Sequence, residues 1–118
     1  MWLDRAEEDL YVLSMLDVTR APNSAAVQCQ QALEKCLKAC WIELEKRVPY
    51  THDLLDLWLE IETEVRVDLS EAGLRRLTPY GTTARYPFGQ VSADEALEAV
   101  VFCVESCAKL KTWLEARA

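Results

Sequence analysis

Apolar residues recur every three or four positions in this chain, which is the spacing of one buried face of an α-helix. The first such stretch predicts a helix over residues 2–17. Its apolar face consists of Ala6, Leu10, Leu13, Tyr11 and Leu16. Residues 18–24 then read as a linker, because Pro22 disfavours a helical conformation at the residue before it.

The second stretch predicts a longer helix over residues 25–46, with Asn23 or Ser24 as its N-cap and Pro49 beyond its end. This helix is apolar on two neighbouring stripes. One stripe consists of Ala32, Cys36, Ala39, Cys40 and Leu44, and the other of Leu33, Leu37 and Trp41. Since each stripe needs a partner, we expect this helix at the centre of a bundle or at a subunit interface.

Two further segments follow before the last helix. A third helix is expected to start at Thr51 or His52 and to run through Val65. Its buried face would consist of Leu54, Leu55, Trp58 and Ile61, broadened by Leu57, Leu59 and Val65. Ser70 is placed to cap a short helix that ends near Leu77, and residues 79–83 favour a turn that leads into a loop.

The last helix has the clearest start in the chain. Ser92 followed by Glu95 three residues later is a capping box, and loss of the Ser92 hydroxyl should cost about 1 kcal/mol. The helix then buries one face, made of Ala96, Val100, Cys103, Cys107 and Leu110. The pattern as a whole predicts one all-α domain over residues 1–118, an up-and-down bundle of four main helices plus a short helix before the last.

Composition narrows the class of protein. The chain has 118 residues, 51% of them hydrophobic, which argues against disorder. Its net charge of -7 argues against sequence-independent binding of long nucleic acid, so we expect no DNA partner. A local pocket for a nucleotide or an RNA end remains compatible with this charge. We see neither a signal peptide nor a membrane span, and therefore expect a cytoplasmic protein.

Five cysteines raise the question of a metal site or a disulfide. Two pairs, Cys36 with Cys40 and Cys103 with Cys107, have the four-residue spacing that places both thiols on one helical face. Because the chain has no C-x-x-C pair and a single histidine, we expect no metal and no cofactor, and interpret the cysteines as small core residues. A disulfide between helices would require an oxidising compartment.

Four short motifs occur in a fixed order: Ala6–Leu10 (AEEDL), Gln30–Ala39 (QQALEKCLKA), Thr51–Leu54 (THDL) and Tyr80–Pro87 (YGTTARYP). In this order the chain resembles the HEPN (higher eukaryotes and prokaryotes nucleotide-binding) family over nearly its whole length. The resemblance implies a helical bundle that forms homodimers. It also implies a genetic partnership with a minimal nucleotidyltransferase, often as a toxin–antitoxin-like module.

Arg85 is the first candidate for ligand binding. Its guanidinium can fork onto a phosphate, and Tyr80 and Tyr86 on either side can stack a base. An ordinary structural ion pair would account for Arg85 equally well. Gln31 and Lys35 complete the predicted ligand-binding set.

Two residues of the same central helix, Glu34 and Lys38, have the i, i+4 spacing of an ordinary surface ion pair. If Gln31 and Glu34 are instead buried, they need hydrogen-bond partners, and they would then hold the loop that carries Arg85.

Arg47 and His52 are the candidates for catalysis. They resemble the Arg-x(4–6)-His pattern of the ribonuclease branch of the family, in which arginine holds the phosphate and histidine moves a proton. In that branch the motif lies near the start of the last helix, whereas here it precedes the third. For His52 we therefore favour a structural role at a helix start, bonded to backbone or to a nearby carboxylate.

Three hypotheses follow. The leading one is a homodimer that binds a nucleotide or RNA end near Arg85, acts with a nucleotidyltransferase partner and has no catalysis of its own. The second is a metal-independent ribonuclease toxin that uses Arg47 and His52. The third is a ligand-free assembly module in which the stripe of alanines and cysteines forms the dimer seam.

Overall fold

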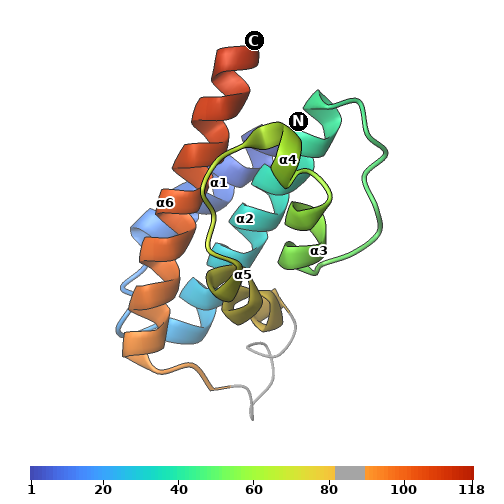
Figure 1. Cartoon of the computed structure of the whole chain (residues 1–118). Helices are drawn as coiled ribbons and strands as arrows, with labels where there is room; N and C mark the ends of the chain where they lie inside the picture. The colour runs from blue at the N-terminus through green and yellow to red at the C-terminus, as the bar shows by residue number, and fades with distance from the viewer. Residues whose placement is uncertain (82–89) are drawn as a thin grey trace.

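The computed structural model describes residues 1–81 and 90–118, and these residues form an all-α bundle (Figure 1). The described residues form six α-helices and one 3-10 helix. In chain order they are α1 (Trp2–Met15), α2 (Pro22–Glu43), α3 (Leu54–Leu59), α4 (Glu62–Val65), α5 (Glu71–Leu77), η1 (Thr78–Gly81) and α6 (Ala93–Arg117). The predicted fold class is confirmed.

The helix α2 lies at the centre of the bundle. It packs most extensively on α1 and α6, while α3, α5 and η1 contact it elsewhere along its length (Figure 1). Both predicted apolar stripes are buried except for Leu44, which is partly buried; Cys36 and Cys40 lie on one stripe and Leu33 and Leu37 on the other. The prediction of a central helix with several partners is therefore confirmed.

The boundaries of α2 differ from the prediction. The helix begins at Pro22, in the first turn where a missing N–H does no harm. Asn23 is not its N-cap, since the Asn23 Oδ1 accepts a hydrogen bond from the backbone N–H of Val91 at 2.8 Å. The helix ends at Glu43, well before Pro49, and Glu45 follows with a left-handed φ of 58°.

The predicted third helix is interrupted. Asp53 caps α3 by accepting hydrogen bonds from the N–H groups of Leu55 and Asp56, so neither Thr51 nor His52 starts it. A second helix, α4, begins at Glu62, so that Glu62 and Glu64 lie in its first turn. The apolar spacing of Leu54, Trp58, Ile61 and Val65 runs on across this break and does not mark it.

Two side chains predicted to be buried are exposed. Tyr11, on α1, and Leu59, at the end of α3, both face solvent. The helix α1 also ends at Met15, two residues earlier than expected. Tyr11 and Leu59 were expected to broaden the apolar face of their helices, so both lie at the border between the buried face and solvent. The end of a helix commonly differs by one or two residues from its expected position.

Both predicted serine caps are confirmed. The Ser70 Oγ accepts a hydrogen bond from the N–H of Gly73 at 3.1 Å and starts α5. At α6 the Ser92 Oγ accepts from the Glu95 N–H, and the Glu95 carboxylate accepts from the Ser92 N–H, each at 3.0 Å. Of the predicted turn over residues 79–83, the part through Gly81 is 3-10 helix and the rest lies outside the described residues.

All five cysteines are buried free thiols, which confirms their interpretation as core residues. The Cys103 Sγ lies 3.4 Å from the carbonyl oxygen of Cys29 and 4.0 Å from the Sγ of Cys107. Burial raises the pKa of Cys40 to about 12, with smaller contributions from Cys36 and Glu43, so this thiol stays protonated at neutral pH. Within residues 1–81 and 90–118, no helix has the length and apolar character needed to cross a membrane.

Candidate functional site

A row of polar side chains is buried along α2. Gln30, Glu34 and Lys38 occur every fourth residue and are 0%, 4% and 8% exposed, respectively. This spacing places them on one side of the helix, beside the stripe that contains Leu33 and Leu37. The expectation that Glu34 and Lys38 form a surface ion pair is therefore wrong: the pair exists, but neighbouring elements cover it.

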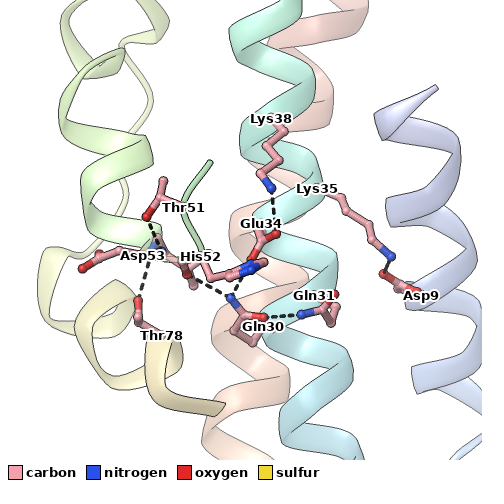
Figure 2. Close-up of polar contacts among 11 residues, drawn as sticks. Asp9, Gln30, Gln31, Glu34, Lys35, Lys38, Thr51, His52, Asp53 and Thr78 are labelled. Carbon is pink, nitrogen blue, oxygen red and sulfur yellow. Dashed lines mark hydrogen bonds and ion pairs between the residues drawn. The ribbon is translucent and has the colours of Figure 1, made fainter. Parts of the chain in front are cut away.

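The carboxylate of Glu34 lies at the centre of this network (Figure 2). Its Oε1 accepts from the Gln30 Nε2 at 3.0 Å and lies 2.9 Å from the His52 Nδ1. Its Oε2 accepts from the Lys38 Nζ at 2.9 Å. Burial alone would raise the pKa of Glu34, but the hydrogen bonds from Gln30, Lys38 and His52 outweigh it and lower that pKa. Glu34 is thus a buried, ionised group.

Gln30 connects three separate parts of the chain. Its Nε2 also donates to the backbone carbonyl of His52 at 3.2 Å, and its Oε1 accepts from the Gln31 Nε2 at 2.7 Å. Gly81 lies against the same amide, so closely that a Cβ at Gly81 would be 2.8 Å from the Gln30 Oε1. Gln30 thereby bonds His52 to the central helix and packs against the last residue of η1.

His52 is held from one side and open on the other. An ionised carboxylate only accepts hydrogen bonds, so the His52 Nδ1 must carry the proton that it donates to Glu34. In the neutral ring the Nε2 is then an acceptor, and the side chain is 58% exposed. The expectation that His52 bonds a nearby carboxylate is confirmed. Arg47, the other candidate for catalysis, is exposed on the same segment between α2 and α3.

Lys35 points away from His52 in Figure 2, toward Asp9, whereas the amide of Gln31 is turned toward Gln30. The Lys35 Nζ lies 2.6 Å from the Asp9 Oδ2 and ties α2 to α1. Gln31 donates to Gln30, as described above. Further along α2, the Lys38 Nζ also lies 5.1 Å from the centroid of the Trp2 ring, a cation–π contact with α1.

Tyr80 lies in η1 and faces a different part of the molecule. It lines a cleft of about 90 Å³ between α5 and α6, together with Arg76, Glu98 and Phe102. Burial raises the pKa of its phenol, and the charges of Glu95 and Glu98 add to the effect. Tyr80 therefore stays a neutral hydrogen-bond donor. Tyr80 contacts residues of α5 and α6, whereas Lys35 is paired with Asp9 of α1, so the structure does not bring these two predicted ligand-binding residues together. Arg85 and Tyr86 lie outside the described residues.

The sequence indicates that Glu34 needs hydrogen-bond partners if it is buried. It does not assign a role to Gln30, and it does not indicate that Lys38 is buried. The signal for both is the four-residue spacing from Gln30 to Lys38. Among the residues described, no group of three or more histidine, cysteine, aspartate or glutamate side chains is arranged to hold a metal ion.

Comparison with known protein families identifies one match. The family model of the HEPN domain matches residues 1–114. No curated protein and no solved structure matched the chain significantly. Because the family model covers nearly the whole chain, the protein belongs to the HEPN family.

Proposed function

We propose that this protein binds a nucleotide or an RNA end through the segment that begins at Tyr80 and contains Arg85 and Tyr86. The observation that carries the proposal is the HEPN match over residues 1–114. In this proposal the Arg85 guanidinium binds a phosphate, Tyr86 stacks on the base, and the neutral phenol of Tyr80 donates a hydrogen bond.

The polar network on α2 supports this proposal. Gly81 is packed against the buried amide of Gln30, so the start of the segment that carries Arg85 is fixed to the centre of the bundle. Gln31 and Lys35 already have partners in Gln30 and Asp9. We therefore assign them a supporting role, in which Gln31 orients Gln30 and the pair of Lys35 with Asp9 holds α2 against α1.

Isothermal titration calorimetry tests the binding step. ATP, GTP and a short RNA are titrated into the purified protein and into Arg85→Ala. Binding by the wild type that is lost in Arg85→Ala supports the proposal. Arg20→Ala is the matched control, since it removes an exposed arginine from the turn between α1 and α2. An absence of heat with every ligand would instead favour the ligand-free assembly module.

We further propose that the protein is a homodimer and acts with a minimal nucleotidyltransferase in a toxin–antitoxin-like module. Family membership is the support for both statements. Sedimentation equilibrium of the purified chain should give twice the mass of 13.5 kDa. Affinity purification of this protein from cells that also express the nucleotidyltransferase should recover that enzyme. A monomeric mass together with no recovered nucleotidyltransferase would contradict this part of the proposal.

A metal-independent ribonuclease is the second candidate, and the contact between Glu34 and His52 favours it. Glu34 fixes the Nδ1 proton of His52 and leaves the Nε2 free to accept a proton from a 2′-hydroxyl. Arg47 would hold the phosphate. RNA cleavage in the presence of a chelator should vanish in His52→Ala, and Glu34→Gln should lower the rate by up to about 10⁴-fold, the loss known for removal of a carboxylate that orients a catalytic histidine. Intact RNA after long incubation at high protein concentration would exclude this activity.

A further inference from the structure

A cleft of about 190 Å³ lies between α1 and α6. Both helices pack extensively on α2 but make few contacts with each other, so the cleft reaches down to α2. Two cysteines line it, Cys36 from α2 and Cys107 from α6, and the other three cysteines do not. Most of its remaining walls are apolar and consist of Leu3, Leu10, Val104 and Ala108.

The thiols of Cys36 and Cys107 meet across the boundary between two helices. Their side chains are hydrogen-bonded to each other, and the Cys107 Sγ also lies 4.0 Å from the Sγ of Cys103. A disulfide requires the two Cβ atoms to lie about 3.5–4.5 Å apart. Residues one turn apart on the same helix, such as Cys103 and Cys107, have Cβ atoms about 5–6 Å apart. The pair that can form a disulfide is therefore Cys36 with Cys107.

Lys111 places a positive charge at the rim of the cleft. It lies one turn after Cys107 and forms an ion pair with Glu7 of α1, with 2.9 Å between Nζ and Oε1. Its charge also interacts with the thiol of Cys36. A nearby ammonium group favours the thiolate, which is the nucleophilic form of cysteine. The pKa of Cys107 is raised by its hydrogen bonds with Cys103 and Cys36, so Cys107 is the protonated partner of the pair.

The size of the cleft selects small reagents. Cys36 and Cys107 are only 1% and 2% exposed, so a bulky thiol reagent cannot reach either sulfur atom from the surface. The cleft is nevertheless several times larger than the volume of about 30 Å³ that one water molecule occupies. Hydrogen peroxide, which has one oxygen atom more than water, fits into it.

We propose that Cys36 and Cys107 form an oxidation site whose substrate is hydrogen peroxide. The Cys36 thiolate attacks one peroxide oxygen, the O–O bond breaks, and the other oxygen leaves as water with the proton that Cys36 has given up. The sulfur of Cys107 then attacks the sulfenic sulfur of Cys36. The S–S bond forms while the hydroxyl group leaves as water with the Cys107 proton.

In total, two thiols are oxidised to one disulfide between α2 and α6, and one peroxide is reduced to two molecules of water. In a reducing compartment such a disulfide is transient, as is typical of redox-sensing cysteines. This site is independent of the proposed nucleotide site and of the ribonuclease alternative, since it shares no residue with either.

Mass spectrometry of the intact wild type tests the proposal. After treatment with hydrogen peroxide the mass should fall by about 2 Da, which is the loss of two hydrogen atoms, and dithiothreitol should restore it. Digestion without a reductant should give one cross-linked peptide pair that contains Cys36 and Cys107. An unchanged mass, an irreversible gain of oxygen or a link between any other pair would overturn the proposal.

Two variants test which thiols react. Cys36→Ala and Cys107→Ala should not lose the 2 Da, while thermal unfolding of the reduced proteins shows that both are folded. Cys40→Ala is the matched control, because Cys40 is also fully buried on α2 but does not line the cleft. It should form the disulfide at the wild-type rate. In wild type unfolded by urea, peroxide should give several different links, and the same single link there would mean that the fold does not direct the reaction.

A third variant tests the role of the charge at the rim. Lys111→Gln should slow the loss of free thiol by about 3- to 10-fold, because it removes one half-exposed positive charge near Cys36. Lys109→Gln is its control, since Lys109 lies on α6 and donates to the carbonyl oxygen of Asp68 instead. Equal rates for Lys111→Gln and the wild type would overturn the role assigned to Lys111.

Discussion

The two buried sides of α2 are built in opposite ways. Towards α6, the side chains are small and apolar, and Cys29 and Cys36 lie near the thiols of Cys103 and Cys107. Towards the segment before α3, a carboxylate, an ammonium group and an amide are buried at the same depth. Both sides exclude water, but only the second must also provide a partner for every polar group.

This difference separates what holds the fold from what positions the candidate site. The side of α2 that faces α6, which we call the thiol side, is stabilised by dispersion and by removal of apolar area from water. Both effects depend on the volume of the side chains and only weakly on their orientation. The polar side gains little net stability from its ion pair, because desolvation offsets the attraction. We infer that its main effect is geometric: it fixes the His52 ring and the Gly81 backbone relative to α2.

Removal of the central carboxylate should have the largest effect. Glu34→Ala leaves the Lys38 ammonium buried without its partner and removes an acceptor from both Gln30 and His52. We expect a loss of about 3–5 kcal/mol in the free energy of unfolding, measured by urea denaturation. Glu105→Ala, at an exposed position of α6, should change stability by less than about 0.5 kcal/mol. A similarly small loss for Glu34→Ala would show that water reaches the network.

A methyl group at Gly81 should have the next largest effect. In Gly81→Ala the new Cβ would lie 2.8 Å from the Cδ and Oε1 of Gln30, and Gln30 is fully buried and has no room to retreat. We expect a loss of about 1–3 kcal/mol from this overpacking. In a double-mutant cycle, Gln30→Ala should remove most of the added cost, because the clash then has no partner. Additive losses would place the strain elsewhere.

The same comparison explains which features the sequence could predict. The start of α6 could be predicted from its capping box, and the two stripes of α2 from their apolar spacing. Both signals are local, because they depend only on residues a few positions apart in the sequence. The break between α3 and α4 was missed because the spacing continues across Ile61.

The candidate site was harder to predict because its partners come from distant parts of the chain. The contact between Glu34 and His52 joins residues 18 positions apart, and whether Lys38 is buried depends on the Trp2 ring that covers it. A row of polar residues beside an apolar stripe reads as a solvated face unless tertiary packing is known. Glu34 and His52 could be singled out from the sequence, but the role of Gln30 and the burial of Lys38 could not.

Substitution on the thiol side should have a smaller effect than either change above. Cys36→Ala removes one sulfur atom from a residue that is 1% exposed, and the Cys107 thiol that it contacts keeps Cys103 as a partner. We expect a loss of about 1 kcal/mol, within the range measured for small reductions of a core side chain. Urea denaturation of this variant beside Glu34→Ala compares the two sides directly. A loss as large as that of Glu34→Ala would mean that the thiols have a more specific role than packing.

The smallest expected effect is a change in the pH dependence of stability. The pKa of Glu34 is lowered in the folded protein, so the native state favours the ionised form. Its contribution to stability is fully present above the ordinary glutamate pKa of about 4.3 and is lost as pH falls through the lower native pKa. Thermal unfolding between about pH 6 and about pH 3 should therefore show a steeper loss of melting temperature in the wild type than in Glu34→Gln, which cannot titrate at this position. Glu34→Gln should be less stable than the wild type near neutral pH, with the difference shrinking in acid. Parallel curves for the two proteins would mean that Glu34 is not held ionised by its three donors, and the geometric account of the polar side would then lose its basis.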